Sequence, residues 1–451
     1  MRKLIFILAL LCCSVRAASP APPAAAVEPA SRSAADAGLS AEDVKRAVAP
    51  HVKGLTLDAA RLRAHVFRPP QIAGVVSDQE SEEGERQPTP PKMPTFTPPA
   101  PHHLDVNAFG QALHKALKDE VAGYVMRLRK HGQTIYTLEW NWAKTPPDGG
   151  VGWTPQRQMH LASVSKLITA IAMTQLLNQN NISYDAKVIG YLPGYWKKGP
   201  NIDKITFRNL LTHKSGFSAA DTDYLTMKDA VAAGVSTDST KPDYIGHYHY
   251  RNMNFGLCRI LIAVMNGNIA KSTVFFPPPL PDLNDQLWDS LTISAYNQYV
   301  QGKVFAASGV TTATLDHPAA GVLAYQFPVV SGGWNSGDLQ SVSGGAGWHM
   351  SIDQLLDVMG TLRRKGTIMS SSAAQTLLDN RFGIDEISDT PAGRLYNKNG
   401  RWIDGAGRTE QSLAYFLPED MELVVLANSP IGNPGKSFRG VVDQIYLANI
   451  K

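Results

Sequence analysis

Ser163 and Lys166 stand at a spacing that suits an activated nucleophile. Residues three apart lie on one face of a helix, so the Lys166 amine can reach the Ser163 hydroxyl. Burial would favour the neutral amine, which can accept the serine proton near neutral pH. A helix N-terminus would add backbone N–H groups that stabilise the oxyanion of a tetrahedral intermediate. Without other motifs, Ser163 would instead be read as a helix cap and Lys166 as a solvated side chain.

A second candidate pair is Tyr250 and Asn252. Alternate side chains of an extended or turn segment point the same way, so both could face a cleft while Arg251 faces away. A phenol near Lys166 could carry a proton between Ser163 and a leaving group, and the amide could orient a substrate carbonyl. A buried tyrosine followed by a helix-capping asparagine is the alternative.

A third motif, Lys398-Asn399-Gly400, precedes a pair of apolar runs near the C-terminus. Its lysine could bind a substrate carboxylate or tune the tyrosine. Its glycine would allow a ligand to approach the strand backbone closely.

The elements that must position these residues are strands from both chain ends and helices between them. Residues 167–177 are apolar on nearly every face, which predicts a buried helix. Residues 122–128 and 134–140 flank His131-Gly132 as a hairpin, and 413–417 and 423–427 form a second strand pair. Residues 106–117 and 438–446 have helical spacing. The predicted fold class is α+β, with one antiparallel sheet built from both chain ends, flanking helices and a largely helical insert.

The first 103 residues have a different character. Residues 1–17 combine a basic start, a short apolar run and small residues before a cleavage point, which predicts a signal peptide and export to the periplasm or medium. An uncleaved membrane anchor is the alternative, although the apolar run is short for a span. Residues 18–103 read as Pro/Ala/Glu-rich linker, with a short helical element at 40–66 capped by Ser40. The main domain is expected over 104–451.

Composition excludes several classes of function. The formal net charge is only +4 over 451 residues, without a basic block, so nucleic-acid binding has no support. His247 and His249 lack further ligands at metal spacing, and no metal or cofactor is expected. Gly435-Lys436-Ser437 lacks the earlier glycine of a P-loop, and the G-x-S-x-G signature of an α/β-hydrolase is absent. Cys258 would be the only cysteine after signal cleavage, so no internal disulfide is expected.

Together, S-x-x-K, Y-x-N and K-x-G in this order resemble the serine β-lactamase and D,D-peptidase superfamily. The Y-x-N form resembles its branch of class C β-lactamases, D-aminopeptidases, D,D-carboxypeptidases and related esterases. The resemblance covers about Leu104 to Lys451 and implies the β-lactamase/transpeptidase-like fold. It is supported by the stretches 161–166, 211–217 and 344–353.

The resemblance also implies roles for individual residues. Ser163 would be the nucleophile and Lys166 its proton partner, while Tyr250 would act as general base and acid. The family further implies a substrate-orienting Asn252, a substrate-holding Lys398 that supports Tyr250, and an oxyanion hole made by the backbone N–H groups of Ser163 and Arg401, next to Gly400. The family usually has small residues where Arg251 and Arg401 stand. Arg401 would either crowd a bicyclic β-lactam or pair with a carboxylate.

The sequence therefore favours an exported serine hydrolase that cleaves a small-molecule or peptide amide or ester through an acyl-enzyme on Ser163. The substrate is open among a β-lactam, a D-amino-acid peptide and an ester, as is the oligomeric state. The rival hypothesis is a penicillin-binding-like protein that binds or senses cell-wall peptides without turnover.

Overall fold

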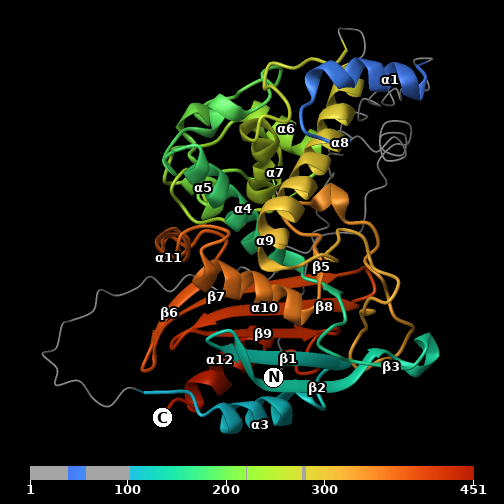
Figure 1. Cartoon of the computed structure of the whole chain (residues 1–451), viewed down its shortest axis with the longest axis vertical. Helices are drawn as coiled ribbons and strands as arrows, with labels where there is room; N and C mark the ends of the chain where they lie inside the picture. The colour runs from blue at the N-terminus through green and yellow to red at the C-terminus, as the bar shows by residue number, and fades with distance from the viewer. Residues whose placement is uncertain (1–38, 57–101, 220, 277–280) are drawn as a thin grey trace, which may run out of the picture.

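A seven-stranded antiparallel sheet, in the order β3-β2-β1-β9-β8-β7-β6, carries the lower half of the molecule (Figure 1). The computed structural model describes residues 39–56, 102–219, 221–276 and 281–451, so the predicted signal peptide and most of the predicted linker lie outside the described residues. The strands are β1 (Gly123–Lys130), β2 (Gln133–Lys144), β3 (Val151–Gly152), β6 (Glu386–Thr390), β7 (Gly393–Ile403), β8 (Thr409–Leu417) and β9 (Met421–Ala427).

The two chain ends meet in the middle of this sheet. β1 pairs with β2 on one side and with β9 on the other, and the β1–β2 turn uses His131 and Gly132, both with positive φ. Leu104 and Ile450 form a further bridge outside the strands. The predicted α+β fold, with a sheet assembled from both ends, is confirmed.

Side chains alternate between the two faces of the sheet, and each face has its own helical cover. On β8, Leu413 and Tyr415 pack in a core with α3 (Val106–Leu117) and α12 (Phe438–Ala448). Ala414 and Phe416 pack in the larger core that includes α4 and α10. This alternation decides which residues of β7 can reach the nucleophile.

The helical part lies above the sheet in Figure 1. Its central helix is α4, in which every residue from Ser165 to Leu177 is buried, as expected for an apolar helix surrounded by protein. Across the described residues, none of the helices has the length and apolarity to cross a membrane. The helices around the sheet and above it are α4 (Ser165–Gln179), α5 (Phe207–Leu211), α6 (Tyr224–Ala233), α7 (Met253–Met265), α8 (Pro281–Tyr299), α9 (Ala306–Ser308), α10 (Ile352–Gly360) and α11 (Ser371–Asp379).

A short N-terminal segment packs onto this helical part. The helix α1 (Ala41–Val48) begins with Ser40 as its N-cap, as predicted, and buries Val44 and Val48 in the main core. Lys53 then exchanges hydrogen bonds with Asn268 after α7. Residues before the domain expected over 104–451 therefore contribute to its core, through an apolar helix face that the composition of the segment did not indicate. The rest of the predicted 40–66 element, from residue 57, lies outside the described residues.

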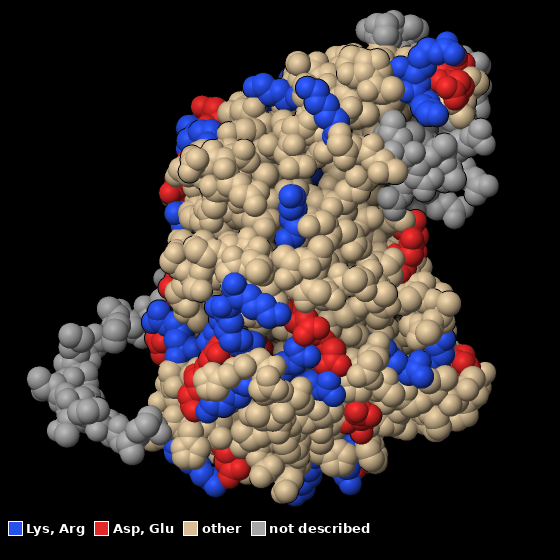
Figure 2. All heavy atoms as spheres, in the orientation of Figure 1, with Lys and Arg blue, Asp and Glu red and all other residues tan. Residues whose placement is uncertain are grey.

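Charged side chains of both signs are interspersed around the sheet-bearing half of the face in Figure 2. Ion pairs account for part of this pattern, because Arg127 and Arg129 of β1 contact Asp353 at the start of α10. No single-sign patch dominates this face.

A small two-stranded sheet joins the segment before Ser163 to the segment before α10. β4 (Met159–His160) pairs antiparallel with β5 (His349–Met350). Directly after β4, the chain enters the 3₁₀ turn that contains Ser163.

Candidate active site

Ser163 lies in the 3₁₀ turn Ala162–Val164, which leads directly into α4. Ala162 has φ of 46°, a left-handed conformation that is uncommon for a residue with a side chain. Neighbouring groups hold the turn, since Leu161 N–H donates to the Trp348 carbonyl at 2.8 Å and the Leu161 carbonyl accepts from Ser412 Oγ at 2.6 Å. Such over-determined strain is typical of functional sites.

The fully buried Lys166 faces the nucleophile from the first turn of α4. Its Nζ lies 3.1 Å from Ser163 Oγ, 2.6 Å from Asn252 Oδ1 and 2.8 Å from the Gly345 carbonyl oxygen. The two oxygens of Asn252 and Gly345 can only accept, so Lys166 donates to both. The side of the nitrogen facing Ser163 can then accept the serine proton as an amine or donate to the alkoxide as an ammonium.

Tyr250 completes the contact around the nucleophile. Its hydroxyl oxygen lies 2.7 Å from Ser163 Oγ, and its ring centroid lies 4.8 Å from Lys166 Nζ and 5.3 Å from Lys398 Nζ. Two ammonium groups beside the phenol would stabilise the negative charge that it carries after losing a proton. The arrangement suits proton transfer to and from Ser163.

The ring of His213 stacks on the ring of Tyr250. The two rings stack with centroids 4.3 Å apart, and His213 Nδ1 accepts the Arg251 backbone N–H at 3.2 Å. Burial, with the charges of Lys166 and Lys398, holds the pKa of His213 well below its usual value. His213 is therefore neutral at physiological pH and fixes the Tyr250–Asn252 segment without adding a charge.

Lys398 is held by Asp385, which the sequence reasoning missed. Its Nζ lies 2.5 Å from Asp385 Oδ1, and the other carboxylate oxygen accepts the Asn399 backbone N–H at 3.0 Å. Lys398 is 1% exposed. The signal that could have found Asp385 is the β6–β7 hairpin, in which Glu386 pairs with Asn397, so that the residue before Glu386 lies beside the residue after Asn397.

Gly400 brings the backbone of β7 against the nucleophile turn. A Cβ at this position would lie 2.5 Å from the Leu161 carbonyl oxygen and 2.8 Å from Ser163 N. Only glycine permits this approach. This approach places two backbone amides on adjoining segments, that of Ser163 and that of the next β7 residue, Arg401. The expected oxyanion hole would use these two amides.

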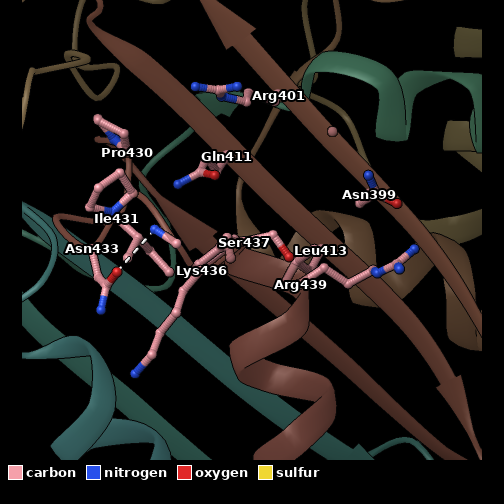
Figure 3. A pocket seen from close by; sticks show the side chains of 14 residues that line it. Asn399, Arg401, Gln411, Leu413, Pro430, Ile431, Asn433, Lys436, Ser437 and Arg439 are labelled. Atoms are coloured by element: carbon pink, nitrogen blue, oxygen red, sulfur yellow. Dashed lines mark hydrogen bonds between the residues drawn. The ribbon is translucent and has the colours of Figure 1, made fainter. Parts of the chain in front are cut away.

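The Arg401 side chain is directed away from the nucleophile. It pairs across the sheet with Gln411, and together with Lys436 and Arg439 these residues line a cavity of about 550 Å³ (Figure 3). This cavity lies on the α12 face of the sheet, because side chains alternate and Gly400 faces Ser163. The expectation that Arg401 crowds a bicyclic substrate or pairs with its carboxylate beside Ser163 therefore does not fit the structure.

Trp402 is the large β7 side chain on the nucleophile's face. It is 6% exposed and, with Asn252, Gly345 and Ala346, lines a small recess that also includes Asp221, Thr222 and Val342. Sequence reasoning missed Trp402, although its even spacing from Lys398 and Gly400 was a usable signal.

The remaining chemical candidates fall outside this cluster. His249 lies against Asp243, and His247 stacks on the ring of Tyr244. Within residues 39–56, 102–219, 221–276 and 281–451, no three metal-ligating side chains gather at a common point. Burial raises the pKa of the Cys258 thiol, which lies inside α7 as a packing residue.

The structure thus brings together Ser163, Lys166, Tyr250, Asn252 and Lys398, with the Gly400 backbone beside them. A serine hydroxyl in contact with a lysine amine and a tyrosine hydroxyl is an arrangement that suits nucleophilic acyl transfer.

Comparison with known proteins agrees. The sequence model described as Beta-lactamase matches residues 109–446, and the chain belongs to the beta-lactamase family. The chain is 27% identical over 158 residues to the putative fimbrial assembly protein FimD, serogroup D, of Dichelobacter nodosus, a match that covers 33% of this chain and 38% of that protein.

Two solved structures share the fold. The class C beta lactamase from Rhodobacter sphaeroides has a TM-score of 0.53 at 19% identity, over 76% of this chain and 99% of that one. The D-stereospecific amidohydrolase from Streptomyces sp. has a TM-score of 0.53 at 20% identity, with the same two coverages. At these identities, the similarity establishes the architecture of the domain.

Proposed function

We propose that this protein is an exported serine hydrolase that cleaves an amide or ester through an acyl-enzyme on Ser163. The observation that carries the proposal is the position of Ser163 Oγ, within hydrogen-bond reach of both Lys166 Nζ, at 3.1 Å, and the Tyr250 hydroxyl, at 2.7 Å. A protein that only binds a ligand has no need of a nucleophile contacted by two proton carriers.

In the acylation step, Ser163 Oγ attacks the substrate carbonyl carbon while its proton passes to Tyr250 or Lys166. The oxyanion is stabilised by the backbone N–H groups of Ser163 and Arg401. When the tetrahedral intermediate collapses, the bond to the leaving amine or alcohol breaks, and Tyr250 donates a proton to that group. Where Lys166 accepted the serine proton, it passes that proton on to Tyr250. Water then attacks the acyl-enzyme by the same route, which releases the acid and restores Ser163.

The Asp385–Lys398 ion pair favours a substrate without a carboxylate at this point. Lys398 is 1% exposed and already bound to Asp385 at 2.5 Å, so a substrate carboxylate would have to compete with an existing carboxylate partner. This supports an activated ester or a neutral amide over a β-lactam as the better substrate. One protein with this fold, from Streptomyces sp., is named a D-stereospecific amidohydrolase, which supports an amide as a candidate substrate.

The test is the intact mass of the purified protein after separate incubation with a penicillin and with an activated short-chain ester. We expect a transient acyl adduct and turnover with the ester, and slower reaction with the penicillin. Both should be absent in Ser163→Ala. Turnover that persists in Ser163→Ala would refute the mechanism, and binding of either compound without an adduct or product would favour the cell-wall peptide sensor. Export is tested separately, by N-terminal sequencing of protein recovered outside the cytoplasm.

A further inference from the structure

A buried pair of ionisable side chains lies directly behind the nucleophile turn. His160 of β4 and Glu410 of β8 are both 0% exposed and 250 residues apart in the sequence, yet His160 Nδ1 lies 3.1 Å from Glu410 Oε2. His160 is three residues before Ser163. The proposed mechanism assigns no role to this pair, and burying two such groups needs a compensating reason.

The other ring nitrogen of His160 fixes its protonation. Nε2 accepts the Gly347 backbone N–H at 3.1 Å, so the ring proton is on Nδ1 and is donated to Glu410. Burial, followed by the charge of Lys166, lowers the pKa of His160 to about 3, and burial raises the pKa of Glu410 to about 8. Burial therefore disfavours the charged form of both side chains, and the Nδ1 hydrogen bond selects one tautomer of His160.

Through this hydrogen bond, His160 contacts the glycine-rich turn Gly344–Gly347. Gly344 and Gly347 both have positive φ, at 91° and 105°, and the carbonyl of Gly345 between them accepts from Lys166 at 2.8 Å. Glycine lowers the rigidity of a turn, so a buried donor–acceptor contact at Gly347 restrains the carbonyl that positions the catalytic lysine. The His160 ring also packs edge-on against Trp402, which lines the small recess, with the ring centroids 5.0 Å apart.

We propose that His160 is a positioning residue which, oriented by Glu410, fixes the Gly344–Gly347 turn and so holds the Lys166 side chain against Ser163. This inference rests on the proposed hydrolase function and goes beyond it by adding two residues outside the three family motifs. A displacement of a reacting group by about 1 Å costs on the order of 10²-fold in rate, so the effect should appear in kcat.

The decisive variants change the two members of the buried pair separately. His160→Phe keeps the ring but removes both contacts, and it should lower kcat for an activated ester about 10- to 100-fold with little change in KM. Glu410→Met should also lower kcat, but by a smaller factor. Glu410→Gln should keep most of the wild-type kcat, because its amide oxygen still accepts a hydrogen bond from His160 Nδ1. The pH profile of acylation should shift in His160→Phe, because the Gly344–Gly347 turn, whose Gly345 carbonyl accepts from Lys166, loses its hydrogen bond to His160.

The matched control is His114→Phe. His114 lies on the opposite face of the sheet, in α3, and its Nδ1 is 2.8 Å from the Tyr124 hydroxyl. This variant should change the melting temperature without changing kcat or the pH profile. Circular dichroism shows whether each variant is folded.

A folded His160→Phe with kcat within twofold of wild type would overturn the proposal. If His160→Phe does not fold, equal kcat in Glu410→Met and Glu410→Gln would overturn it instead. The outcome is separable from the proposed function, because that function fails if Ser163→Ala keeps turnover or if the wild-type protein forms neither adduct nor product. The other groups that face the pair are His349, with its ring 5.2 Å from His160, His317 and Ser336 next to His349, and the Lys166 ammonium.

Discussion

Gly400→Ala tests the closest backbone contact of the site. The added Cβ would lie 2.5 Å from the Leu161 carbonyl oxygen, 2.7 Å from Ser412 Oγ and 2.8 Å from Ser163 N, whereas ordinary contact begins near 3.4 Å. Leu161 and Ser412 cannot simply move apart, because they are hydrogen-bonded to each other at 2.6 Å. The β7 backbone must therefore shift away from the nucleophile turn by roughly 0.9 Å.

This shift separates the two amides proposed to form the oxyanion hole. Loss of one such donor costs about 10² to 10³ in kcat, and the overpacking should lower the free energy of unfolding by about 1–3 kcal/mol. The assay is the single-turnover acylation rate with an activated ester, measured at a temperature where circular dichroism shows the variant to be folded.

Gly405→Ala is the matched control, since it lies in the turn after β7 and no atom lies within 4 Å of its added Cβ. It should keep the wild-type rate. A folded Gly400→Ala with the wild-type acylation rate would refute the reasoning that this glycine defines the oxyanion hole.

Three further predictions concern charges. Asp385→Asn should lower both kcat and the free energy of unfolding, the latter by about 3 kcal/mol, because it leaves the buried Lys398 without its carboxylate; unchanged urea denaturation would contradict this. Burial raises the pKa of Glu410 from 4.5 to about 8, so between these values the unfolded chain ionises while the folded chain stays protonated, and stability falls as pH rises. Glu410→Gln should therefore reduce the loss of stability between pH 5 and pH 8, by up to about 1.4 kcal/mol per pH unit in the free energy of unfolding. The melting temperature of the variant should then fall less with pH, and parallel wild-type and variant curves would count against this. Arg401→Gln should leave kcat/KM for a neutral ester within about twofold, because its side chain lines the cavity on the α12 face; a large loss in steady-state assays would place it beside Ser163 instead.

The three short motifs predicted that Ser163, Lys166, Tyr250, Asn252 and Lys398 lie together. Ser163 and Lys166 are close because they share one helical turn, which is a local property of the sequence. Tyr250 and Lys398 could be joined to them only through the order of motifs in a known superfamily, since spacing alone does not bring residues so distant together.

The direction of Arg401 was predictable and was missed. Lys398 and Gly400 face the nucleophile, so period-two alternation places Arg401 on the other face and Trp402 on the same face. The motif reading treated the residues after Lys398 as one surface, although a strand presents two.

The acidic partners Glu410 and Asp385 needed three-dimensional information that the three motifs do not carry. Glu410 meets His160 only because β8 lies beneath the nucleophile turn, and neither residue belongs to a motif with its own spacing. Asp385 required the register of the β6–β7 hairpin, which a weakly apolar edge strand does not specify.

The pairing of β1 with β9 has a consequence for how the chain folds. β1 ends at Lys130 and β9 begins at Met421, so the two central strands of the sheet are separated by almost the whole domain. During synthesis, β1 can form only its hairpin with β2 until the last strand has emerged, and the loop closed between them is entropically costly. The nucleophile turn receives its contacts to Gly400 and Ser412 from strands on the late side of that closure. The candidate site is therefore among the last parts of the domain to assemble. Truncation before β9 would leave the β1–β2 hairpin and the strands β6, β7 and β8 without the strand that joins them.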